Sequence, residues 1–235
     1  MNDLKIAIDD GHGLKTPGKR TPDGYKENEF NHYTKEYLVE ELKNNDYKVI
    51  DCSPTRDDNN LANRCNIAND NNADIFVSIH FNAMGSKWQT SASGIETYYH
   101  HGSTKGKKLA RCIQDQLIKG TKQIDRGIKD DYILYSSGLY VLHHTKMPAI
   151  LCECGFMDNP SEAVLMKSPA FRKECGSEIC KGICNYFGRP YRENKEPSKK
   201  VKYFVQTGAF SEYKNAAAMV QTLKEKNINA IIKQS

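Results

Sequence analysis

The sequence predicts an α/β protein with an open, mostly parallel twisted sheet, helices on both sheet faces, and a small C-terminal β-α-β module. Strand-like and helix-like segments alternate over residues 1–187, which is typical of such a sheet. One strand, within "ADIFVSIHFNA", is apolar at consecutive positions, as expected for a strand covered on both faces. After this region, a polar stretch with two prolines precedes one more strand-helix-strand pattern.

The elements follow from local hydrophobic patterning. Apolar or alternating runs predict five strands, at Lys5 to Asp9, Lys48 to Cys52, Asp74 to Phe81, Gly94 to Tyr99 and Ala149 to Glu153. Helical spacing predicts four helices between them, at Glu29 to Asn44, Asn60 to Asn71, Lys105 to Ile118 and Phe171 to Tyr186.

The same patterning divides the chain into a main domain at 1–187, a linker at 188–200 and a module at 201–235. In the module, apolar residues such as Val220 and Leu223 fall at helical spacing between two strand-like runs. A core of this size is too small to fold alone. The module therefore either continues beyond this chain or pairs with a second copy in a homodimer.

Composition and charge exclude several classes of protein. A hydrophobic content of 38% allows a folded core, and no run of about 18 apolar residues predicts a membrane span. The first residues enter a strand pattern without an apolar signal-peptide segment, so we expect synthesis in the cytoplasm. The net charge of +5 lies wholly in residues 191–235, a basic surface that attracts polyanions without selecting one class.

Eight cysteines would indicate disulfides in a small secreted protein, but without a signal peptide they predict reduced thiols. The alternative is a cysteine zinc site. It is disfavoured because the sequence contains no C-x-x-C pair.

Polar residues with chemical potential stand where predicted strands end. His12 follows the first strand in "IDDGHG", between two glycines that permit a tight turn. It could be a metal ligand, a general base or a polar turn residue. His80 stands where the buried strand emerges, and it could instead be a hydrogen-bonded core histidine.

Two glutamates complete the candidate set. Glu27 opens the helix that begins "ENEFNHYTKEYL", where the helix dipole alone would favour an acid. Glu153 lies in "PAILCECGFMDNP", in surroundings too apolar for a carboxylate unless a cation or metal is nearby. Because ligands collect beyond the carboxyl ends of parallel strands, His12, His80 and Glu153 could converge. Two histidines and a carboxylate form a ligand set of catalytic zinc, and a further carboxylate can take a proton from water.

Several motifs in this order resemble the zinc-dependent N-acetylmuramoyl-L-alanine amidases of bacterial cell lysis, sporulation and phage endolysins. They are "IDDGHG", the first glutamate of "KENEFN", "ADIFVSIHFNA", "GIETYY", "RGIK" and "LYVLHHTKMPAILCECGFMDNP", over residues 4–187. The resemblance implies Zn²⁺ ligands at His12, Glu27 and His80, and a catalytic glutamate at Glu153. The helical period places Glu29 about 200° from Glu27, so only one of them can face the site.

The resemblance implies that the substrate is peptidoglycan, cut at the amide between the lactyl group of N-acetylmuramic acid and L-alanine, with neither nucleic acid nor membrane as a partner. A product without a signal peptide would reach the wall through a phage holin or through lysis of the producing cell, as an endolysin or autolysin. The opening "YFVQTGAF" of the tail resembles the first half of a SPOR-type peptidoglycan-binding domain.

Two other functions remain open: a zinc exopeptidase, and a non-catalytic cell-wall-binding protein. The second requires a broken ligand set, whereas all four key positions are filled. Four histidines outside the motifs of the implied ligands are assigned no metal role; they are His100, His101, His143 and His144.

Overall fold

The computed structural model of the protein describes residues 3–16, 18–55, 59–193, 210–226 and 228. The chain forms two compact units, Met1–Asn194 and Lys195–Ser235.

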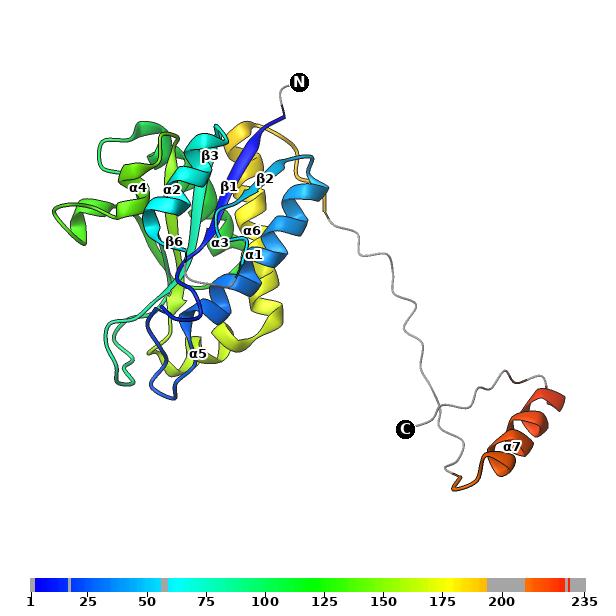
Figure 1. Ribbon diagram of the computed structural model, residues 1–235. Coiled ribbons are helices and arrows are strands. Elements are labelled where there is room, and N and C mark those ends of the chain that lie inside the picture. The colour runs from blue at the N-terminus through cyan, green and yellow to red at the C-terminus, as the bar shows by residue number, and fades with distance from the viewer. Residues whose placement is uncertain (1–2, 17, 56–58, 194–209, 227, 229–235) are drawn as a thin grey trace. The chain divides into compact units, whose positions relative to one another are not determined.

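Six strands form one sheet in the first unit, in the order β2-β1-β3-β6-β4-β5 (Figure 1). The strands are β1 Lys5–Asp10, β2 Lys48–Asp51, β3 Ile75–Asn82, β4 Ile95–Tyr99, β5 Asp125–Asp130 and β6 Ala149–Phe156. Strands β2, β1, β3 and β6 are parallel to one another. Strand β4 runs antiparallel to β6 and parallel to β5. The prediction of a mostly parallel α/β sheet is confirmed.

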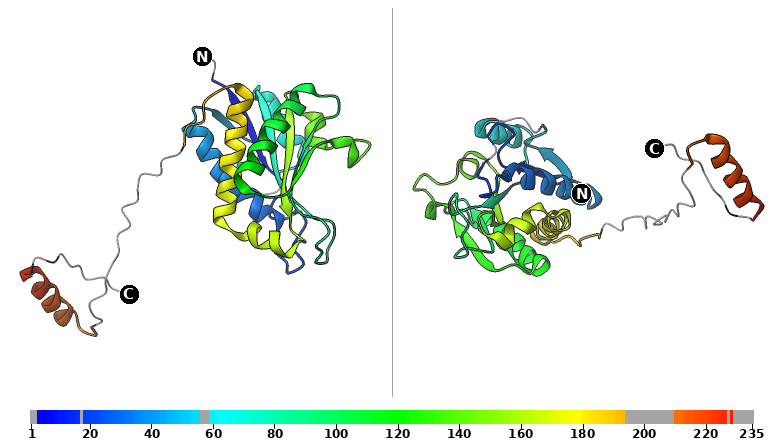
Figure 2. Two further views of the ribbon diagram at one scale, coloured as in Figure 1. Left: turned by 180° about the vertical axis from the view of Figure 1, so that it is seen from behind. Right: turned by 90° about the horizontal axis from the view of Figure 1, so that it is seen from below.

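Helices cover both faces of this sheet. They are α1 Glu27–Asn44, α2 Leu61–Asp70, α3 Thr104–Thr121, the short α4 Tyr140–His144, α5 Pro160–Lys167 and α6 Pro169–Phe187. Alternate residues of a strand point to opposite faces, so Ile6 and Ile8 pack in one apolar cluster and Ala7 in another. The first cluster includes residues of α1, α3 and α6, and the second includes residues of α2 and α4. Figure 2 shows α3 and α6 side by side on the first face.

The strands of the sheet do not all end on the same side. An edge of the sheet here means one of the two sides at which strands begin and end, and not an outermost strand. At one edge the carboxyl ends of β1, β3 and β6 lie together, because Asp10 is level with Ile79 and His80 is level with Glu153. The carboxyl end of β4 lies at the other edge, because Tyr99 pairs with Ile150 near the beginning of β6. Both edges therefore receive chain segments that leave a strand, which is where binding sites form in such sheets.

The structure contains elements that the sequence patterning did not predict. Strand β5 reads "DRGIKD", in which charges and a glycine hide the two-residue period. Helix α4 is only five residues long. Helix α5 begins at Pro160 after the capping residue Asn159. Helix α1 begins at Glu27, as expected for the glutamate that opens the helix, and so two residues before the range drawn from helical spacing.

All eight cysteines are free, as expected, and seven of them are buried, whereas Cys112 is partly exposed. Burial raises the pKa of Cys52 and Cys152, so these thiols pack as small apolar side chains.

In the second unit, the structure describes one helix, α7 Tyr213–Glu225. Val220 and Leu223, which we expected on its apolar face, are half-buried. The two strands predicted on either side of α7 lie outside the described residues. Within the part of the chain that the structure describes, no helix is both long and apolar enough to cross a membrane.

Candidate metal centre and active site

His12 lies in a tight turn directly after β1. Its backbone has a φ of 70°, a left-handed conformation that few non-glycine residues adopt. Two backbone hydrogen bonds hold the turn, from Gly11 N to Ile79 O at 3.2 Å and from Gly13 N to Thr16 O at 3.1 Å. The His12 side chain keeps 34% of its surface exposed, so its ring stands at the rim of the sheet edge.

A buried network of charged and polar side chains around Asp9 holds this turn in place. The Arg64 guanidinium donates to the His12 carbonyl oxygen at 2.7 Å and forms an ion pair with Asp9. Ser53 and Ser78 hydroxyls donate to the Asp9 carboxylate at 3.0 and 2.7 Å. Burial opposes the charge on Asp9, but Arg64 and the Ser78 hydrogen bond outweigh it and lower the Asp9 pKa. The turn that carries His12 is therefore fixed by a compensated ion pair.

Glu27, the first residue of α1, lies between the two histidines. Its Oε2 atom is 3.3 Å from His12 Nε2, and its Oε1 atom is 2.8 Å from His80 Nδ1. The backbone amides of Lys19 and Phe81 also donate to its carboxylate, at 3.1 and 3.3 Å. Asn31, one turn further along α1, donates to Gly11 O at 2.9 Å and so ties the helix to the His12 turn.

The charges in this group favour each other. Burial alone would raise the pKa of Glu27, but hydrogen bonds with His12 and His80 lower it well below its usual range. Burial alone would lower the pKa of His12, but the hydrogen bond and charge of Glu27 raise it. The cluster thus favours a proton on His12 beside the Glu27 carboxylate, and a metal ion could take the place of that proton.

His80 comes from β3, and its ring meets that of His12 edge to face, with centroids 5.0 Å apart. One possible ligand atom from each of His12, Glu27 and His80 lies within 4.8 Å of the other two. The structure thus brings together all three residues that the resemblance implied as metal ligands.

Two glycines pack closely against this cluster. A Cβ atom at Gly11 would overlap the His80 ring, and one at Gly18 would overlap both the Glu27 carboxylate and the His12 ring. At both positions a side chain would displace the site residues, so the backbone approaches them this closely because it is glycine.

Glu153 lies beside His80 on the neighbouring strand β6. Its Oε2 atom is buried without a hydrogen-bond partner among the described residues. Burial raises its pKa well above the usual range, and the negative charges of Glu27 and Glu96 raise it further. A carboxyl group in this condition is suited to accept and return a proton.

Glu96, on β4 opposite Glu153, was not among the predicted site residues. Arg126 Nε donates to its carboxylate at 2.7 Å, Lys129 forms an ion pair with it, and Tyr98 donates at 2.6 Å. The motif "RGIK" contains both cations, so a signal for this group was present in the sequence. Arg64, by contrast, stood in an unremarkable helix with no local signal.

A sequence profile comparison decides the family. The profile of the N-acetylmuramoyl-L-alanine amidases matches residues 6–185. The chain belongs to this amidase family. The enzyme class predicted from the sequence is therefore confirmed, whereas the resemblance of the tail to a SPOR-type domain stays a prediction.

Individual relatives agree with the family. The amidase CwlM of Bacillus licheniformis is 32% identical over 232 residues, which cover 97% of this chain and 84% of CwlM. The uncharacterized protein YqiI of Bacillus subtilis strain 168 is 32% identical over 187 residues, covering 77% of this chain and 84% of YqiI. The crystal structure of an N-acetylmuramoyl-L-alanine amidase from Clostridium difficile 630 superposes with a TM-score of 0.73 at 30% identity. It covers 80% of this chain and 98% of that chain.

Proposed function

We propose that this amidase hydrolyses the amide bond between the lactyl group of N-acetylmuramic acid and the L-alanine of the peptidoglycan stem peptide, with Zn²⁺ as its metal. The observation that carries the proposal is the cluster of His12, Glu27 and His80 next to a carboxyl group, Glu153, that lacks a partner among the described residues. The names of the family and of its relative CwlM support the substrate.

The residues present fit a zinc ion. Two imidazoles and one carboxylate are a recognised donor set for catalytic zinc, and the close approach of Gly11 and Gly18 leaves these three side chains as the lining of the site. Zinc bound there would polarise the scissile carbonyl group and lower the pKa of a water molecule.

Glu153 supplies the proton transfers. Its carboxylate removes a proton from the attacking water while the water oxygen bonds to the carbonyl carbon. The same carboxyl group then donates that proton to the L-alanine nitrogen as the carbon–nitrogen bond breaks, because an amide anion is a poor leaving group. The products are a lactyl carboxylic acid, which releases its remaining proton at neutral pH, and the free amino group of L-alanine. Burial and the neighbouring negative charges, which raise the pKa of Glu153 in the metal-free protein, favour retention of this proton until it is transferred.

The metal part is tested by comparing two glutamates of the same helix turn. Glu27→Gln and His80→Ala are expected to lose bound zinc and turnover together, whereas the matched control Glu29→Gln keeps both. Metal content is measured by elemental analysis and turnover on purified cell walls. Full activity after complete chelation would contradict the proposal.

Product analysis tests the bond that is cut. Digested walls should gain free L-alanine amino groups, and the released glycans should carry unsubstituted lactyl groups. Release of single amino acids from peptides instead would indicate a zinc exopeptidase. Binding to walls without any new amino groups would indicate a non-catalytic wall-binding protein.

For the tail, we propose that residues 201–235 bind the wall or pair with a second copy. The excess positive charge of residues 191–235 supports attraction to an acidic polymer. Deleting residues 195–235 should leave turnover on soluble muropeptides unchanged while weakening attachment to walls. Equal wall binding by both forms in a co-sedimentation assay would remove this role. Release by a holin or by lysis stays a prediction.

A further inference from the structure

A second group of potential metal ligands lies outside the proposed active site. It consists of His100, which follows β4, Asp131, which begins the short helix η1 Asp131–Ile133, and His143 on α4. One possible ligand atom from each residue lies within 4.8 Å of the other two. From the sequence alone, these histidines are assigned no metal role, because neither lies in a motif that carries one of the implied zinc ligands.

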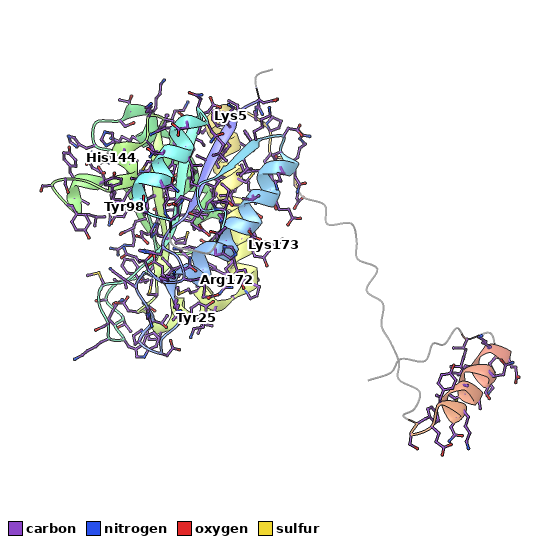
Figure 3. All side chains as sticks on the ribbon, viewed as in Figure 1. Lys5, Tyr25, Tyr98, His144, Arg172 and Lys173 are labelled. Atoms are coloured by element: carbon purple, nitrogen blue, oxygen red, sulfur yellow. The ribbon has the colours of Figure 1, made fainter. Side chains whose placement is uncertain are left out.

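This group lies at the other edge of the sheet from His80 and Glu153. Tyr99, at the end of β4, is paired with Ile150 near the beginning of β6, whereas Glu153 lies further along β6. In Figure 3, His144 on α4 and Tyr25, which precedes α1, mark well-separated parts of the molecule. A metal bound by His100, Asp131 and His143 would therefore be separate from the one proposed for the active site.

The Asp131 carboxylate is buried and held in a fixed orientation. Its Oδ1 atom accepts a hydrogen bond from His101 N at 2.9 Å, and its Oδ2 atom accepts one from Leu139 N at 2.9 Å. The same Oδ2 atom lies 2.9 Å from His143 Nε2. Backbone donors that orient a carboxylate in this way are typical of the outer partners of a metal ligand.

A hydrogen bond between Asp131 and His143 would suffice to attach α4 to the sheet, but it leaves His100 unexplained. The His100 ring meets the His143 ring edge to face, with centroids 4.1 Å apart. Its Nδ1 atom is buried and has no hydrogen-bond partner among the described residues. A buried ring nitrogen without a partner is costly unless something absent from the protein chain binds there.

A glycine also approaches this cluster, as two glycines approach the first. Gly138 has a φ of +67°, and a Cβ atom there would overlap His143 Nε2 and crowd the Asp131 carboxylate. Because Gly138 has no side chain, its backbone can lie directly against the possible ligand atoms of His143 and Asp131.

We propose that His100, Asp131 and His143 bind a second Zn²⁺ ion, with a structural role. Two imidazoles and one carboxylate suit zinc and similar transition metals, whereas Mg²⁺ and Ca²⁺ prefer oxygen ligands alone. The ion would join the end of β4, η1 and α4, and so fix the segment 131–143 on the sheet. The proposed ion would lie near the beginning of β6, whereas Glu153 lies further along that strand, so the ion would take no part in the reaction.

Metal stoichiometry of the full chain tests this site. Metal-free protein titrated with Zn²⁺ in a calorimeter is expected to bind two equivalents. The His100→Ala variant should bind one equivalent, at the active site, and the His12→Ala variant should bind one equivalent, at the second site. The matched control is His144→Ala on the same helix, whose ring packs on Tyr140 outside the cluster; it should still bind two. A wild-type stoichiometry of one that His12→Ala abolishes and His100→Ala leaves intact would overturn the proposal.

Thermal unfolding provides an independent measurement and does not depend on activity. The double variant His12→Ala/His80→Ala removes the first site, so any zinc effect that remains reports the second. At a free Zn²⁺ concentration about a hundred times the dissociation constant, its unfolding midpoint should rise by about 5–10 °C. Adding His100→Ala should abolish this rise.

The His100→Ala variant suits this purpose because the Nδ1 atom of His100 donates to and accepts from no described residue. The unfolding midpoint of the metal-free triple variant should therefore be close to that of the double variant. If it is not, His100→Gln replaces His100→Ala in the same comparison. An equal zinc-induced rise with and without His100 would overturn the second site while leaving the proposed amidase mechanism untouched.

Discussion

Asp9 and Glu153 are two carboxylates of the same sheet, and the protein treats them in opposite ways. Asp9 forms an ion pair with Arg64 and accepts hydrogen bonds from two serines, and its pKa is lowered. Glu153 has a buried oxygen without a partner among the described residues, faces other negative charges, and has a raised pKa. The first carboxylate holds the His12 turn, and the second is the one for which we propose proton exchange.

On the proposed mechanism, the difference reflects the different tasks of the two carboxylates: one stabilises the fold and the other takes part in the reaction. A buried charge that only supports structure is compensated, because an uncompensated one costs several kcal/mol. A group that must change its protonation state cannot be compensated so fully, and the fold tolerates the cost. Four experiments can break or sharpen this comparison.

The largest effect is expected on turnover in Glu153→Gln. The amide cannot take a proton from water or return it to the leaving nitrogen, so kcat should fall by about 10²–10⁴. Zinc content should remain that of the wild type, since Glu153 is not one of the proposed ligands. Turnover on muropeptides near the wild-type value, with zinc confirmed, would transfer the proton-transfer role to another residue.

A loss of about 3–5 kcal/mol in the free energy of unfolding is expected in Arg64→Met. The substitution leaves Asp9 buried and charged without its cation, and it removes the hydrogen bond to His12 O. Adding Asp9→Asn should recover part of the loss, because the uncompensated charge is then gone. Urea denaturation of the single and double variants measures both values. If the two variants were equally unstable, the ion pair would not be the cause.

The acid sensitivity of unfolding should distinguish the compensated carboxylate. The folded-state pKa of Asp9 lies below its unfolded value of 3.8, so its contribution is present above that pH and is lost as the pH falls through the folded pKa. Between about pH 4 and pH 2, stability should therefore fall less steeply in Asp9→Asn/Arg64→Met than in the wild type, by up to about 1.4 kcal/mol per pH unit. Parallel slopes would show that Asp9 does not titrate with unfolding.

The smallest effect is a gain in stability in metal-free Glu153→Gln. Because the folded-state pKa of Glu153 is raised, its charged form destabilises the folded protein at pH values above its usual pKa of 4.5, and this cost disappears at lower pH. At pH 7 the substitution should stabilise the metal-free protein by about 0.5–2 kcal/mol, with no gain near pH 4. A loss of stability at pH 7 would mean that Glu153 has a partner in solution.

The sequence predicted the features that depend on local patterning. The apolar runs predicted the three strands whose carboxyl ends carry His12, His80 and Glu153, and the convergence of parallel strand ends follows from topology alone. The assignment of Glu27 rather than Glu29 relied on the family motif. In the structure, Glu27 contacts both histidines.

Other features could not be predicted because their cause lies far away in the chain. Arg64 is 55 residues from Asp9, and nothing in the helix "LANRCNIAND" marks its guanidinium as buried. The reversed direction of β4 depends on its pairing with β6 and not on its own residues, so the second sheet edge with His100 was not foreseen. The helix α5 is different, since its capping Asn159 and Pro160 were readable signals that the patterning overlooked.

The close approach of Gly11 to the His80 ring has a consequence for how this protein can change during evolution. Gly11 has no functional group, and a change to alanine would be scored as mild by any scale of chemical similarity. Yet the added methyl group would displace the His80 ring from Glu27. Selection should therefore preserve Gly11 as strictly as His12, Glu27 and His80, so the set of positions that the active site constrains is larger than the set of side chains proposed to perform its chemistry.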